Sequence, residues 1–100
     1  MIEQAGDRLR VTAPMVIANA RALLEAGQRT LRSLDSRQQS AELLLDLAAV
    51  SEVDSSSLST VFAWQRKASE RRVSLRIVNP PASMLSLAAL YGVSELLPLA

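Results

Sequence analysis

The sequence predicts an α/β domain built on a parallel or mixed sheet, and two observations support this fold class. Segments with strand-like and helix-like hydrophobic periodicity alternate as strand, helix, strand, helix, strand, helix, which implies right-handed crossovers between neighbouring strands. The chain has 100 residues, of which 49% are hydrophobic and 21% charged, the balance of a folded globular domain. We therefore expect a single domain over residues 1–100.

The first half of the chain begins with a predicted strand over residues 8–12, where polar and apolar side chains alternate. Residues 1–4 are a candidate pairing strand, with residues 5–7 as the turn. Pro14 precedes a predicted helix over residues 15–34, and residues 35–40 are polar and predict a loop. The apolar face of the helix has three- and four-residue spacing and comprises Val16, Ala20, Leu23, Leu24, Gly27, Leu31 and Leu34.

The second half begins with the run LLLDL at residues 43–47, which is typical of a central strand covered on both faces. A group of N-cap residues at 54–57 predicts the start of a second helix, which ends near residues 70–72. Residues 73–78 alternate as a strand, and the two prolines after Asn79 break it. A third helix is predicted over residues 82–91 and stops at Gly92, followed by one further helical turn before Pro98.

Composition argues against most kinds of catalysis. The sequence contains neither cysteine nor histidine, so disulfides, Cys/His zinc sites, cysteine nucleophiles and histidine-based triads are excluded. Asp46, Glu52 and Asp54 lie near one loop and could hold Mg²⁺, but no glycine-rich phosphate loop accompanies them. The net charge of +1 gives little support for nucleic-acid binding. We expect a protein that is not an enzyme and that has no cofactor, no metal and no nucleic-acid partner.

Targeting and membrane-spanning segments are not expected. Residues 1–10 carry four charged side chains and lack the apolar core of a signal peptide. The charge-free stretch over residues 77–93 is interrupted by two prolines and is too short to span a bilayer. These features predict a soluble, cytoplasmic protein.

The sequence DSSS at residues 54–57 lies at a predicted helix N-terminus, where free N–H groups and the helix dipole favour an anion. A serine hydroxyl at this place could accept a phosphoryl group. The alternative is that Asp54 or a serine simply caps the helix, since these residue types are common N-caps. The sequence leaves both interpretations open.

The segment VSEVDSSSL, in which Asp54 and Ser55 follow an apolar strand, resembles the signature of the STAS domain family. The resemblance extends over nearly the whole chain through the strands LLLDL and VSLRIVN. The closing sequence LAALYGVSELLP is similar to that of the MlaB-like branch of the family. Ser57 departs from the family pattern, which usually has glycine at this position and so allows more backbone freedom.

This resemblance implies a STAS-like fold, with a four- or five-stranded mixed sheet and helices packed mainly on one face. It implies a non-enzymatic accessory subunit that binds the ATPase subunit of an Mla-type phospholipid-transport ABC complex. Such a complex also contains permease and lipid-binding subunits and maintains outer-membrane lipid asymmetry. The protein would then lie on the inner face of the inner membrane, associated with it indirectly. The alternative is an anti-sigma-factor antagonist that is regulated by phosphorylation of Ser55.

Two helices supply further candidate contacts with a partner. On the second helix, Ser56 and Thr60 are predicted to point away from a buried face centred on Leu58, Val61 and Gln65. Trp64 lies on the flank, either as a binding hot spot or as a cover for the rim of the core. The third helix is apolar nearly all round, so part of it is either exposed or covered by the C-terminal leucines. The candidate partner-binding residues are Asp54, Ser55, Ser56, Thr60, Trp64, Leu85 and Ala89.

The only basic cluster comprises Arg66, Lys67, Arg71, Arg72 and Arg76. It is most simply the solvated end of a helix, where cations complement the dipole. Contact with anionic lipid headgroups is the alternative.

Overall fold

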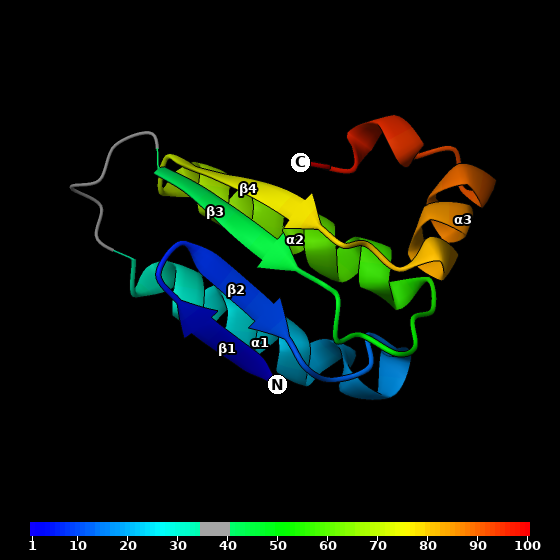
Figure 1. Ribbon diagram of the computed structural model, residues 1–100, viewed down its shortest axis with the longest axis horizontal. Helices are drawn as coiled ribbons and strands as arrows, with labels where there is room; N and C mark the ends of the chain where they lie inside the picture. Colours follow the sequence, from blue (N-terminus) through cyan, green and yellow to red (C-terminus); the bar gives the residue numbers. More distant parts are fainter. Residues whose placement is uncertain (35–40) are drawn as a thin grey trace.

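The computed structural model describes residues 1–34 and 41–100, and its elements follow the predicted order (Figure 1). The loop predicted over residues 35–40 lies outside the described residues. The strands are β1 (Ile2–Ala5), β2 (Arg8–Val11), β3 (Ala41–Asp46) and β4 (Val73–Val78). The helices are α1 (Ile17–Arg32), α2 (Ser56–Glu70) and α3 (Ala82–Leu90), followed by the 3₁₀ turn η1 (Ser94–Leu96).

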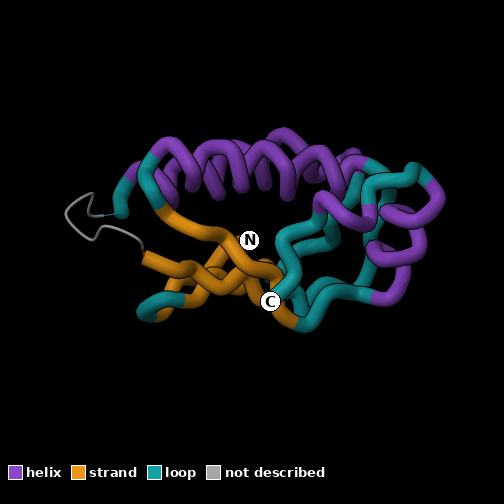
Figure 2. The backbone as a smooth tube through the Cα atoms, turned by 90° about the horizontal axis from the view of Figure 1, so that it is seen from above, coloured by secondary structure: helices purple, strands orange, loops and turns teal. Residues whose placement is uncertain are grey.

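The sheet is mixed and has the strand order β1-β2-β3-β4. β1 pairs with β2 antiparallel through a turn at Gly6, which has a φ of 60°, and the other two pairings are parallel. Both crossovers step in the same direction across the sheet, so right-handed connections place α1 and α2 on the same face. Figure 2 shows these two helices above the strands, and α3 lies past the carboxyl end of β4 in Figure 1. The predicted α/β fold with helices mainly on one face is confirmed.

Alternating side chains of the strands face the two helices and form one side of the core. The buried residues of this face are Leu9, Val11, Leu43, Leu45, Val73, Leu75 and Ile77. On the opposite face Glu42 is exposed and Leu44 is only half-buried. The prediction that the strand at residues 43–47, now β3, is covered on both faces is therefore wrong, because α1 and α2 both lie on the same side of the sheet.

Helix α1 begins two residues later than predicted. Met15 is extended and forms a parallel bridge with Val53, in which its N–H donates to the Glu52 carbonyl at 2.9 Å. The N–H of Asp54 donates to the Met15 carbonyl at 3.2 Å. These bonds hold the segment before α1 beside the segment before α2, so the two helices start at the same end of the molecule.

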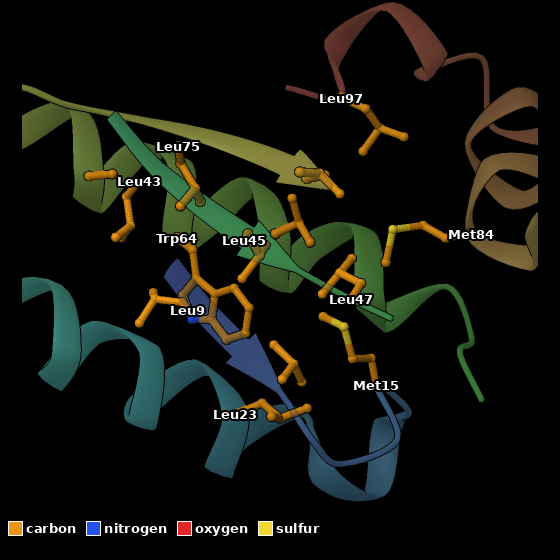
Figure 3. Packing of buried hydrophobic residues seen from close by; sticks show 14 of the residues in the cluster. Leu9, Met15, Leu23, Leu43, Leu45, Leu47, Trp64, Leu75, Met84 and Leu97 are labelled. Carbon is orange, nitrogen blue, oxygen red and sulfur yellow. The ribbon is translucent and has the colours of Figure 1, made fainter. Parts of the chain in front are cut away.

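The core between the helices and the sheet is built around Trp64, which is 1% exposed. Figure 3 shows its indole ring near Leu9, Leu23 and Leu45, and its Nε1–H donates to the Leu24 carbonyl at 3.3 Å. A Cβ atom at Gly27 would overlap the indole ring. The glycine in the middle of α1 therefore provides the space that lets α2 pack closely against it.

Candidate functional site

Asp54 connects the starts of α1 and α2. Its Oδ1 accepts hydrogen bonds from the Ser56 N–H at 2.9 Å and from the Ser56 hydroxyl at 2.5 Å. Its Oδ2 accepts a bond from the N–H of Ile17, the first residue of α1, at 2.9 Å. The Ser56 hydroxyl, and after it the Ile17 N–H, lower the pKa of the Asp54 carboxyl. Asp54 is thus an ionised cap shared by two helices.

The N–H groups at the start of α2 are used within the protein. The Ser56 N–H binds Asp54, the Ser57 N–H donates to the Asp54 carbonyl at 3.0 Å, and the Leu58 N–H donates to the Ser55 carbonyl at 3.2 Å. The Asp54 carboxylate therefore caps this end of α2, as one of the two interpretations of the sequence predicted.

The three serines after Asp54 have different environments. Ser55 is exposed and makes no side-chain cap hydrogen bond, whereas the Ser56 hydroxyl is held by Asp54. Ser57 is 1% exposed, and its Oγ has no hydrogen-bond partner among the described residues. Ser57 already lies within α2, so the position where the family usually has glycine is inaccessible to a partner. Of these three, only Ser55 has an exposed hydroxyl that makes no hydrogen bond with the described part of the chain.

Two candidate contacts on α2 are corrected by the structure. Trp64 is in the core, and Thr60 is only 5% exposed. The buried face of α2 is rotated toward α1, because this helix covers one flank of α2 while the sheet covers another. The interpretation of Trp64 as an exposed hot spot is wrong, and so is the alternative that it covers the rim, because the ring lies within the core between α1, α2 and the sheet.

The exposed side of α2 lies in a surface trough of about 860 Å³, which we call the α2 trough. α2 lies between α1 and α3, each of which contacts it, and no contact joins α1 to α3 among the described elements. From the predicted set, the trough includes Ser55, Ser56 and Thr60 but not Asp54, Trp64, Leu85 or Ala89. It is lined by Ile17, Ala20, Arg21, Leu24, Ser55, Ser56, Leu58, Ser59, Thr60, Phe62, Ala63, Arg66, Tyr91 and Val93.

Sequence reasoning did not identify Ile17, Arg21 and Tyr91 as parts of this surface. Ile17 is 75% exposed and Tyr91 is 58% exposed, so both present apolar surface to solvent along the trough. The sequence could have indicated Ile17, because Ala20 and Leu24 follow it three and seven residues later and so lie on the same side of α1. Tyr91 comes to the trough from a distant segment, so no local pattern places it there.

Leu85 and Ala89 lie on an exposed side of α3, as one of the two interpretations predicted. Met84 and Ala88 face the core, while Leu85 is 39% and Leu90 is 77% exposed. The C-terminal segment buries Leu97 but leaves Leu96 62% exposed. It therefore does not cover the outer surface of α3, and apolar side chains remain exposed next to Tyr91.

Of the three carboxylates near the loop after β3, Asp46 and Asp54 are engaged by separate sets of donors. Asp46 accepts bonds from the Ala48 N–H at 3.0 Å, the Asn79 amide at 3.1 Å and Arg8 at 2.8 Å. The Ala48 N–H, followed by the Asn79 amide, lowers the pKa of Asp46. No group of three or more potential metal ligands occurs in residues 1–34 and 41–100. These donors occupy the oxygens of Asp46 that a cation would need.

The basic cluster is divided between surfaces. Arg66 lines the α2 trough, whereas Lys67 forms an ion pair with Glu70 at 3.6 Å. Of the helices described here, none is both long and apolar enough to cross a membrane.

Comparisons with known proteins agree with this architecture. A family model described as "Mlab, STAS domain" matches residues 2–98. No curated protein matches the chain. A protein from Thermotoga maritima described as an anti-sigma factor antagonist is similar in structure, with a TM-score of 0.74 and 16% identity over 99% of this chain and 83% of that one.

Two other solved structures share the fold at low sequence identity. A STAS domain protein from Planctomyces limnophilus has a TM-score of 0.72 and 8% identity over 99% of this chain and 86% of its own. The anti-sigma factor antagonist SpoIIAA in its unphosphorylated form has a TM-score of 0.63 and 12% identity over 90% of this chain and 81% of its own. Because the family model also spans nearly the whole chain, this protein belongs to the STAS domain family.

Proposed function

We propose that this protein is a non-enzymatic accessory subunit that binds the ATPase subunit of an Mla-type phospholipid-transport ABC complex. The observation that carries the proposal is the match of residues 2–98 to the family described as "Mlab, STAS domain". In this proposal the protein stabilises or regulates the ATPase, and it meets the permease and lipid-binding subunits only within the assembled complex. Its place is then cytoplasmic, on the inner face of the inner membrane, with lipid asymmetry of the outer membrane as the result of transport.

The exposed surface supports a docking role. Ser55 offers an exposed hydroxyl at one end of the α2 trough, and the trough is mostly apolar along its length. The Asp54 carboxylate does not contact the partner directly in this proposal; it holds the two helices that form the trough. Function then needs surface complementarity and no cofactor, metal or nucleic acid, in keeping with a sequence that lacks histidine and cysteine.

The test is co-purification with the ATPase subunit of an Mla-type complex, using variants that fill the trough. Ser59→Trp places a large ring in the trough at an exposed helical position, and it should reduce recovery of the ATPase at least tenfold. Ser69→Trp is the matched control, because Ser69 is an exposed serine of the same helix outside the trough. Undiminished binding by Ser59→Trp, or no binding by the native protein, would contradict the proposal.

The second candidate function is that of an anti-sigma-factor antagonist switched by phosphorylation of Ser55. It is supported by the exposed Ser55 hydroxyl and by the description of similar structures as such antagonists. Incubation with an anti-sigma-factor kinase and ATP, followed by intact-mass measurement, discriminates between the two. One added phosphate on the native protein and none on Ser55→Ala would favour this candidate over transport.

A further inference from the structure

We infer that the segment received by the α2 trough is an amphipathic α-helix of the partner, with carboxylates beside its apolar stripe. This inference rests on the proposed function, since the partner is the ATPase subunit named there. It specifies the secondary structure, the length and the charge of the segment that docks. Each of these three properties follows from a different feature of the trough.

The secondary structure follows from the backbone of the lining. The lining residues of α1 and α2 have their backbone polar groups committed to helical hydrogen bonds. Beyond α3, the N–H of Tyr91 donates to the Leu87 carbonyl at 3.0 Å, and the N–H of Val93 donates to the Ala88 carbonyl at 2.8 Å. An extended segment would find few backbone partners here and would lose hydrogen bonds to water. A helix satisfies its own backbone and needs only side-chain contacts.

The length follows from the extent of the lining. On α2 the trough runs from Ser55 to Arg66, which is roughly 16 Å, or about three helical turns. On α1 it runs from Ile17 to Leu24, which is about two turns. A partner helix of roughly eleven residues therefore fits along α2. Small side chains along the middle of α2, namely Ser59 and Ala63, allow its backbone to approach closely.

The charge follows from the polar rim. Among the described residues, the two charged residues of the lining, Arg21 and Arg66, are both cations, and none of the described carboxylates lines the trough. Arg21 pairs with Glu25 at 3.6 Å, but its side chain is 92% exposed, so this pair is weak and can exchange for another. Arg66 takes part in none of the ion pairs found in the described parts of the chain. Carboxylates flanking the apolar stripe of a helix would complement both arginines.

The first experiment maps the docked segment by cross-linking. The sequence has no cysteine, so Ser59→Cys can be labelled uniquely with a thiol-reactive benzophenone before it is mixed with the ATPase subunit. Illumination and mass spectrometry should identify partner residues spaced three, four or seven apart, with carboxylates nearby. Ser69→Cys, labelled in the same way, should give at least tenfold less cross-linked product. Cross-links to consecutive or alternate residues would show an extended segment and would overturn the inference.

The second experiment reverses the rim charges. The double variant Arg21→Glu and Arg66→Glu should weaken the affinity for the ATPase subunit about tenfold, with the loss shrinking as salt is raised. Arg10→Glu with Arg76→Glu is the control, because it changes the net charge equally on the opposite, exposed face of the sheet. Equal effects of the two double variants would overturn the inference while leaving the proposed function intact. If the native protein does not bind the ATPase subunit at all, the inference and the proposed function are both contradicted.

Discussion

At the residue scale, the Asp54 carboxylate bonds to the first turns of two helices at once. One oxygen serves Ser56 and the other serves Ile17, which lies 37 positions earlier in the chain. A capping residue normally serves one helix, so its loss frays one end. Loss of Asp54 would release the starts of both α1 and α2 and alter the trough between them.

We expect Asp54→Ala to be less stable than Asp54→Asn, and both to be less stable than the native protein. Asparagine keeps one acceptor oxygen and can cap one helix, whereas alanine keeps none. Urea unfolding followed by the fluorescence of Trp64, the only tryptophan, measures the order of the three midpoints. Asp7→Asn, in the exposed β1–β2 turn, is the control that should unfold like the native protein. A native-like midpoint for Asp54→Ala would contradict the shared-cap interpretation.

The acid dependence of stability should follow from the lowered pKa of Asp54 and Asp46. A carboxyl whose pKa is lower in the folded state contributes stability above its unfolded pKa of about 4, and this is lost as the pH falls through the folded pKa. The native protein should therefore lose stability below about pH 4, and Asp54→Asn should lose less over the same interval. Urea midpoints measured across that interval check this. Parallel acid dependences of the two proteins would exclude a contribution from Asp54.

At the element scale, the contact between α1 and α2 depends on Gly27 and Trp64. Replacing a glycine inside a helix by alanine ordinarily stabilises the helix by about 1 kcal/mol. Here the new methyl group would overlap a buried indole ring, and overpacking of this kind costs about 1–3 kcal/mol. The two effects have opposite signs, and the second outweighs the first because neither the ring nor the helix backbone can move freely.

Gly27→Ala should therefore lower the free energy of unfolding by up to about 2 kcal/mol, although it raises helix propensity. The double variant with Trp64→Phe should show less additional loss than the sum of the single variants, since the smaller ring leaves room for the methyl group. Urea unfolding followed by circular dichroism measures all four proteins without using the tryptophan signal. If Gly27→Ala proved more stable than the native protein, α1 and α2 would be able to move apart around the new methyl group without losing packing energy, which would contradict this prediction.

The elements themselves were predictable because their periodicity is local. The alternation at 73–78 and the spacing of Leu23, Gly27 and Leu31 each identify a face that the structure buries. The burial of Trp64 was not predictable in the same way. A helical wheel of α2 assumes one covering surface, but α2 is covered by the sheet on one side and by α1 on another. The direction of that second cover depends on the packing of α1, which the sequence of α2 does not contain.

At the scale of the whole molecule, the two parallel crossovers align α1 and α2. Their starts meet at Asp54, and their last turns carry Arg29, Arg32 and Lys67 at the opposite end. The exposed large apolar side chains, apart from Met1, gather at the start of α1, on α3 and in the segment after it. The exposed large apolar side chains therefore lie toward the end of the molecule where α1 and α2 begin, and the cations of the last helical turns lie at the other end. The DSSS motif predicted a candidate site at the start of α2 but not this gathering, which joins Ile17 to Tyr91 across 74 positions.

Substitutions at neighbouring residues of α3 should affect stability and partner binding independently, because some of these side chains are buried and others are exposed. Met84 is fully buried, so Met84→Ala should cost about 2–5 kcal/mol of stability. Leu85 and Leu90 are exposed, so Leu85→Ala and Leu90→Ala should change stability by no more than about 0.5 kcal/mol. If α3 extends the docking surface beyond Tyr91, these two variants should nevertheless weaken binding to the ATPase subunit. Urea midpoints and binding affinities of the same preparations provide both measurements.

The control for this last comparison is Leu99→Ala, which removes an exposed leucine from the C-terminal segment instead of α3. Its backbone bridge to Ile77 does not require the side chain, so folding should be preserved. If Leu85→Ala and Leu90→Ala bind the ATPase subunit as tightly as Leu99→Ala does, the apolar surface of α3 lies outside the interface, and the partner contacts only the α2 trough. If Leu85→Ala and Leu90→Ala bind the ATPase subunit more weakly at unchanged stability, one partner surface contacts both α2 and α3, because no change in the core accompanies the loss of affinity.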